Sequence, residues 1–102
     1  MTTVAQQEDA ETIARELLRQ RLAACVQIIG PLKSYFWWQG KIDRAAEYLC
    51  IIKSRTDLYP RAEEAIMHVH PYDVPEIVAT PIVAGSGGYL QWLGAELRAP
   101  EQ

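Results

Sequence analysis

Side chains that could bind a metal or move a proton gather in one short stretch of the chain, residues 68–76. It holds both histidines, His68 and His70, followed by Asp73 and Glu76. Imidazole and carboxylate groups are ligands for divalent cations, and they also act as general acids and bases. The stretch therefore suggests either a metal site or an acid–base site.

The spacing of the histidines does not match a helical metal signature. His68 and His70 are two residues apart, which places them on different faces of a helix, whereas helical zinc motifs space their ligands by three or four residues. Asp73 and Glu76 offer oxygen ligands, and Cys25 offers sulfur only where the fold brings it close. The pattern favours a histidine that caps or hydrogen-bonds a helix end, and it leaves a metal site at His70 open.

Other catalytic arrangements have less support. Cysteine catalysis needs an exposed thiolate beside a base, and Cys25 lies in an apolar run that predicts burial. The glycine-rich residues 85–88 lack the lysine and the spacing of a phosphate-binding loop. An enzyme that uses His70, Tyr72 and Glu76 as acid–base groups stays an alternative.

Apolar side chains at helical spacing predict the helices that flank this stretch. The first covers residues 8–22, with Asp9 as a plausible N-cap. The second covers about residues 56–69 and ends there, because Pro71 cannot continue a helix. A last short helix begins after Ser86.

The middle of the chain predicts a long β-hairpin. Residues 24–38 form one strand with a bend or bulge at Gly30-Pro31, and residues 42–53 form the return strand after a turn at residues 39–40. Four consecutive aromatic residues at 35–38 must alternate between the two faces of their strand. A sheet with one face exposed to solvent would leave some of these bulky rings in water. We therefore expect another copy of the chain to cover them.

Two further strands complete the expected order of elements. Residues Thr2–Ala5 offer a short first strand, and Glu76–Val83 offers a last one, with Pro81 at an edge or bulge. The resulting β-α-β-β-α-β order with a C-terminal helix is that of a ferredoxin-like sandwich, and it predicts one α+β domain over residues 1–102. The first strand is central in that arrangement, so either it is unusually short or the native chain starts upstream of Met1.

Composition and charge exclude several classes of function. A content of 49% hydrophobic and 23% charged residues is typical of a globular domain. The net charge of −3 and the lack of a basic run exclude nucleic acid as an expected partner. The sequence shows neither a secretory signal nor an apolar run long enough for a membrane, so we expect a cytoplasmic protein with no membrane partner. Cys25 and Cys50 lie among apolar residues and predict buried, reduced thiols.

The motifs of this chain resemble those of the CutA family, the divalent-cation tolerance proteins, from about Thr2 to Leu97. The motifs that carry the resemblance are, in order, Leu22-Ala23-Ala24-Cys25-Val26, Tyr35 with Trp38-x-Gly40-Lys41, Ile51-Ile52-Lys53, His70-Pro71-Tyr72-x-Val74-Pro75-Glu76-Ile77 and Tyr89-Leu90-x-Trp92. The resemblance implies a ferredoxin-like domain in a homotrimer similar in architecture to PII signalling proteins. It also implies a cytoplasmic protein of divalent-metal tolerance, with copper binding and without established enzymatic activity.

The resemblance also implies where a metal or another ligand would bind. Family members with proposed copper ligands use a first-strand cysteine and two adjacent histidines, and the matching positions here are Thr2, Val69 and His70. His70 is therefore the candidate ligand for a weakly bound copper or other divalent cation. The residues that match family positions expected near an inter-subunit cleft are Trp38, Lys41, Lys53, Tyr72, Glu76, Tyr89 and Trp92. The alternative function is a PII-like sensor that binds a small anionic metabolite in these clefts.

Overall fold

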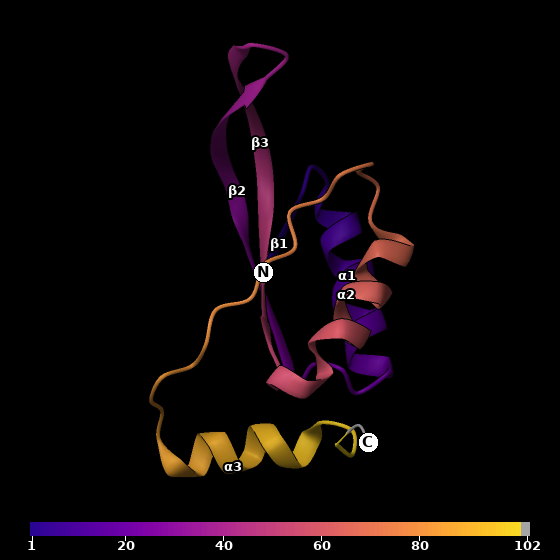
Figure 1. Ribbon diagram of the computed structural model, residues 1–102, viewed down its shortest axis with the longest axis vertical. Coiled ribbons are helices and arrows are strands. Elements are labelled where there is room, and N and C mark those ends of the chain that lie inside the picture. Colours follow the sequence, from indigo (N-terminus) through magenta and orange to yellow (C-terminus); the bar gives the residue numbers. More distant parts are fainter. Residues whose placement is uncertain (101–102) are drawn as a thin grey trace.

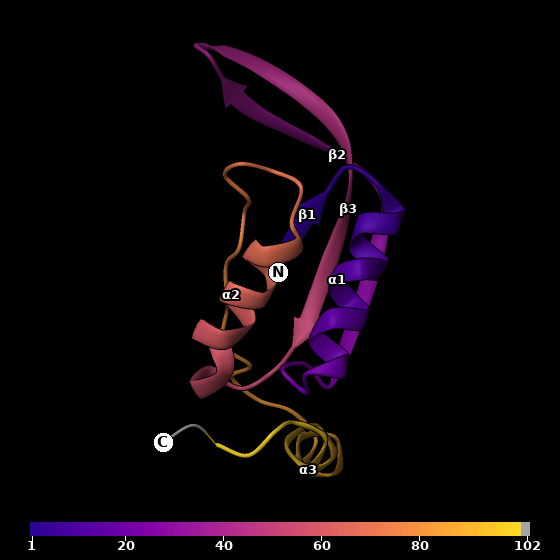
Figure 2. The ribbon, with the colours of Figure 1, turned by 90° about the vertical axis from the view of Figure 1, so that its right-hand side faces the viewer.

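The structure is a computed structural model, and it describes residues 1–100. The chain forms a three-stranded antiparallel sheet with two helices on one face (Figures 1 and 2). The elements are β1 Thr2–Val4, α1 Gln7–Arg19, β2 Cys25–Trp38, β3 Lys41–Lys53, a 3-10 turn Thr56–Leu58, α2 Tyr59–Val69 and α3 Gly87–Glu96. Helices α1 and α2 cover the sheet, and their apolar sides form the core with it. The core side chains that are fully buried are Val4, Ala10, Leu17, Leu22, Cys50 and Leu58.

The strand order confirms the ferredoxin-like arrangement. The sheet runs β1-β3-β2, and β1 pairs with β3 through Thr2–Cys50 and Val4–Tyr48. On its other side, Thr2 forms a single antiparallel bridge with Ile77. The first strand is therefore short but internal, as the order of elements requires.

The predicted last strand, Glu76–Val83, is wrong beyond its first residues. The Met1 nitrogen donates to the Val78 carbonyl oxygen at 2.7 Å, and the Val78 amide donates back to Met1 at 3.1 Å. No regular element follows until α3 within the part of the chain that the structure describes. In the antiparallel register of Thr2 and Ile77, Val78 lies opposite Met1, so the described residues of this chain offer no backbone partner on that side to residues 79–83. In addition, Pro81 has no amide to donate.

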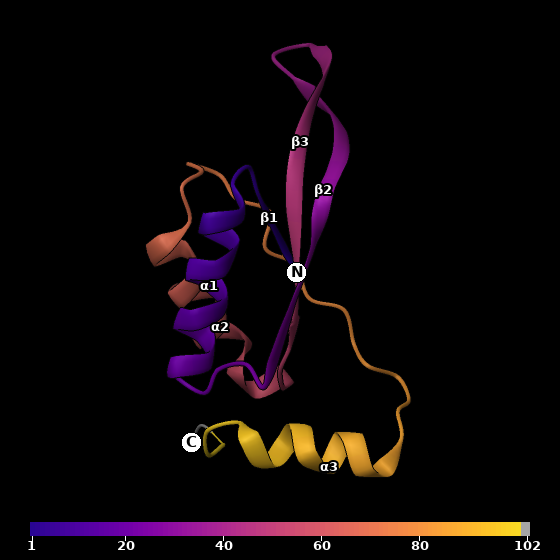
Figure 3. The same cartoon turned by 180° about the vertical axis from the view of Figure 1, so that it is seen from behind.

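The hairpin of β2 and β3 forms as predicted. The register shifts between Ile29 and Leu32, where the cis Gly30-Pro31 bond lies. A side chain at Gly30 would place its Cβ 2.6 Å from the Tyr48 ring, so glycine is required there. The turn uses Gln39 and Gly40 with φ of 50° and 79°, the left-handed geometry that a two-residue hairpin needs. The tip of the hairpin extends beyond the helices (Figure 3).

The boundaries of α1 depart from prediction at both ends. The helix ends at Arg19 and not at residue 22 as predicted, and Arg21 has a left-handed φ of 55° that does not continue a helix. Helix α1 has Gln6 at its N-cap, and Asp9 lies inside the first turn, where its charge suits the positive end of the helix dipole. The predicted cap at Asp9 is therefore wrong. Helix α2 ends at Val69 with His70 as its C-cap, so the stop expected from Pro71 is confirmed.

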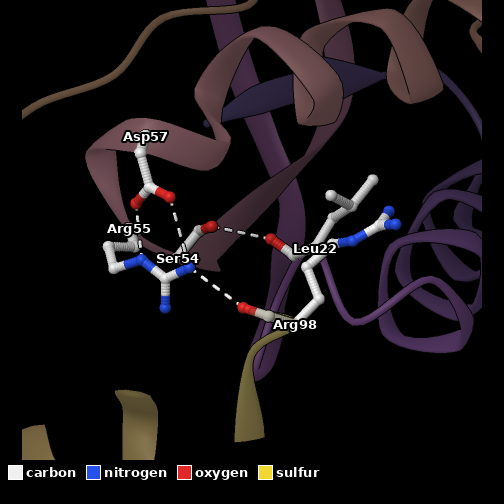
Figure 4. A network of polar contacts seen from close by, with 5 residues as sticks. All are labelled: Leu22, Ser54, Arg55, Asp57 and Arg98. Carbon is white, nitrogen blue, oxygen red and sulfur yellow. Dashed lines mark hydrogen bonds and ion pairs between the residues drawn. The ribbon is translucent and has the colours of Figure 1, made fainter. Parts of the chain in front are cut away.

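Helix α3 lies beyond the end of the sheet and is held mainly at its C-terminal end. Only Leu93 of this helix is buried. The Arg55 guanidinium donates to the Arg98 carbonyl oxygen at 2.9 Å and pairs with Asp57, while Ser54 donates to the Leu22 carbonyl oxygen at 2.7 Å (Figure 4). The bond from Arg55 ties the segment after α3 to the end of β3, and the bond from Ser54 ties the end of β3 to the loop after α1.

The two cysteines differ in burial. Cys50 is fully buried in the core as predicted, whereas Cys25 is half-buried, so the predicted burial of Cys25 is wrong. The difference follows from position: Cys25 begins β2, a strand with β3 on one side and no other strand beyond it in the described sheet. Both thiols are free.

Candidate functional site

His70 is the centre of a buried hydrogen-bond network. Its ring is only 9% exposed. The Tyr72 amide donates to His70 Nδ1 at 3.1 Å, so this nitrogen carries no proton and Nε2 carries it. His70 Nε2 lies 3.0 Å from the Thr3 carbonyl oxygen, to which it donates, and 3.1 Å from Thr2 Oγ1. Through these bonds His70 joins the end of α2 to β1.

Burial sets the protonation state of His70. Desolvation lowers the pKa of His70 below its usual value, and it outweighs the hydrogen bond to Thr3 and the charges of Asp9 and Glu47, which act in the opposite direction. A proton on Nδ1 would also place an N–H donor opposite the Tyr72 amide, which is itself a donor. The fold therefore holds His70 neutral.

Tyr72 continues the network to β3. Its ring packs edge-on against the His70 ring with a centroid distance of 4.9 Å, and its hydroxyl donates to Glu47 Oε2 at 2.8 Å. Burial, followed by the hydrogen bond to Glu47, raises the pKa of Tyr72 to about 12. Sequence reasoning missed Glu47, a carboxylate that is only 8% exposed. Its partner is 25 residues away, so no local pattern could have identified the pair.

The residues expected to complete a copper site do not surround His70 with ligands. Thr2 does contact His70, but through a hydroxyl bond to the ring nitrogen. Cys25 pairs in register with Lys53, and His68 is exposed on α2. Among residues 1–100, no three His, Cys, Asp or Glu side chains lie close enough to hold a metal ion as they stand.

The seven expected cleft residues are not brought together within one chain. Trp38 and Lys41 face each other at the tip of the hairpin, whereas Lys53 ends β3. The Tyr89 and Trp92 rings lie 5.6 Å apart on α3. Figure 1 shows the hairpin tip and α3 at opposite ends of the molecule.

The side chains of Lys53 and Glu76 have different surroundings. The Lys53 ammonium donates to Gln27 Oε1 at 2.9 Å on the neighbouring strand. Glu76 is exposed in the segment before the Thr2–Ile77 bridge. Tyr72 is the one expected cleft residue that belongs to the His70 network.

Two hollows lie outside this network. The larger, of about 790 Å³, is mostly apolar and lies between the end of β3, the start of α2, residues 77–82 and α3, with Lys53 and Arg55 on its wall. We call it the strand groove. The smaller, of about 450 Å³, lies between α1 and α2 and is lined by polar side chains that include Glu16, Glu64 and His68. We call it the helix groove.

These features define a small ferredoxin-like α+β domain with a projecting antiparallel hairpin. The model of the CutA1 divalent ion tolerance protein family matches residues 1–96, and the chain belongs to that family. No helix within the described residues is long and apolar enough to cross a bilayer.

Relatives in two organisms support this assignment. The divalent-cation tolerance protein CutA of Thermus thermophilus is 45% identical over 91% of this chain and 90% of its own length. A solved structure of the Thermus thermophilus protein superposes with a TM-score of 0.92 at 43% identity, covering 95% of this chain and 94% of that one. The structure described as the periplasmic divalent cation tolerance protein CutA of Archaeoglobus fulgidus gives a TM-score of 0.91 at 39% identity, with 95% and 94% covered.

Proposed function

We propose that this protein is a non-enzymatic homotrimer of divalent-cation tolerance that binds copper or another divalent cation weakly. Membership of the family and the names of its relatives support the role in cation tolerance. The observation that carries the homotrimer is the projecting hairpin, on which Trp37 is 73% exposed and Tyr35, Trp38 and Ile42 are also exposed. Apolar surface of this kind in a soluble domain is typical of a protein interface.

Two further segments support self-association. Residues 78–86 lie in an exposed, irregular path, and Val83 in this segment is 91% exposed. Helix α3 presents Tyr89, Leu90 and Trp92 to solvent in a single chain. A closed homotrimer would cover the hairpin, this segment and α3, and it would bring the hairpin tip of one copy toward the α3 of another.

Cation binding at His70 carries a defined cost. A metal at Nδ1 must displace the Tyr72 amide, and a metal at Nε2 must displace the Thr3 carbonyl oxygen. Each displaced buried group loses a hydrogen bond, which costs about 1–3 kcal/mol. Binding through His70 is therefore weak in this proposal.

Calorimetric titration with Cu(II) tests the proposal. We expect the wild-type protein to bind Cu(II) weakly, and we expect His70→Gln to bind it less tightly because one ligand is lost. Equal affinities for the two proteins would contradict His70 as a ligand. An absence of heat with Cu(II), Zn(II), Ni(II) and Co(II) alike would contradict direct cation binding.

A second function, that of a sensor for a small anionic metabolite, is favoured by the strand groove. Lys53 on its wall is hydrogen-bonded to the neutral Gln27, so its positive charge stays available to an anion. A thermal-shift screen with nucleotides and organic acids tests this function. A ligand that raises the melting temperature of the wild type and of Lys33→Ala but not of Lys53→Ala would support this function. A screen in which no compound raises the melting temperature would contradict it.

The chemistry of the network supports a role without catalysis. An acid–base enzyme would need His70 or Tyr72 to exchange protons near neutral pH, yet His70 is engaged at both nitrogens and the pKa of Tyr72 is about 12. Glu76, the third group of that alternative, is exposed and outside the network. The free thiols of Cys25 and Cys50 support the expected cytoplasmic location, although one solved relative is described as periplasmic.

A further inference from the structure

We draw no further inference here: the strongest candidate, the strand groove between the end of β3, residues 77–82 and α3, already carries the second proposed function, and nothing in the structure shows what covers the rest of its apolar wall.

Discussion

Two regions of the molecule differ in how far one chain satisfies them: the network around His70, where α2 meets β1, and the projecting end of the β2–β3 hairpin. In the network, as elsewhere among the described residues, every buried side-chain nitrogen and oxygen has a hydrogen-bond partner, including those of His70 and Glu47. At the hairpin end, Trp37 and Ile42 are left in solvent although the backbone pairing is complete. The polar network is satisfied within one chain, whereas the hairpin leaves apolar side chains exposed, and this difference is the basis of the proposed homotrimer.

The largest effect is expected from a substitution at the exposed end of the hairpin, which should abolish the homotrimer. Trp37→Glu places a carboxylate on a surface that the homotrimer would bury, and it also removes the burial of an aromatic side chain, together costing several kcal/mol per interface. We expect the mass in solution, measured by light scattering, to fall from that of three chains to that of one. Lys33→Gln, on the same hairpin, should leave the mass unchanged. A homotrimer in Trp37→Glu would place Trp37 outside the interface.

The next effect concerns the hydrophobic core between the sheet and helices α1 and α2. Leu17 of α1 is fully buried, so Leu17→Ala should lower the free energy of unfolding by about 2–5 kcal/mol through lost burial and the cavity left behind. Leu18→Ala is the matched control, because Leu18 is next in sequence but exposed. Urea unfolding at one fixed protein concentration measures both variants. Equal losses would contradict the assignment of the buried face of α1.

A smaller effect tests the polar network at its carboxylate. Glu47→Gln replaces the charged acceptor of the Tyr72 hydroxyl with a neutral one, which should cost about 1 kcal/mol of stability. It should also lower the pKa of Tyr72 from its value of about 12, which the ultraviolet absorbance of the phenolate reports. An unchanged pKa would show that burial alone sets it.

The smallest effect is a pH dependence that originates at His70. Because the pKa of His70 is lower in the folded state than the unfolded value of about 6.5, the unfolded chain binds the proton more readily. The contribution of His70 to the free energy of unfolding should therefore be constant above about pH 7.5 and fall as the pH drops through 6.5 toward the lower folded pKa. His70→Gln should remove this slope, and a slope of the same size in the variant would assign it to another group.

Much of the fold could be predicted from local residue chemistry. Gly30-Pro31 indicated the bend in β2, residues 39–40 indicated the turn, and Pro71 indicated the end of α2, because each constraint acts on the backbone where it occurs. The strand expected over Glu76–Val83 failed because a strand needs a partner, and the register that sets Met1 opposite Val78 leaves residues 79–83 with none on that side among the described residues. The apolar sequence of that segment contains no information about the length of its neighbour.

The candidate site was predictable only in part for a related reason. His70 and Tyr72 were identified because they share one motif, whereas Glu47 was missed because its bond to Tyr72 is made by the tertiary fold. The expected cleft residues are divided between the hairpin tip, the end of β3 and α3. Their meeting depends on contacts between copies, which the proposed homotrimer would provide.

In the proposed homotrimer, two other copies of the chain cover the hairpin that one copy leaves exposed. Sedimentation-velocity ultracentrifugation of the wild-type protein across the micromolar range tests this most directly. A homotrimer should give one species with three times the 11.5 kDa mass of the chain at every concentration. A single species at 11.5 kDa would contradict it.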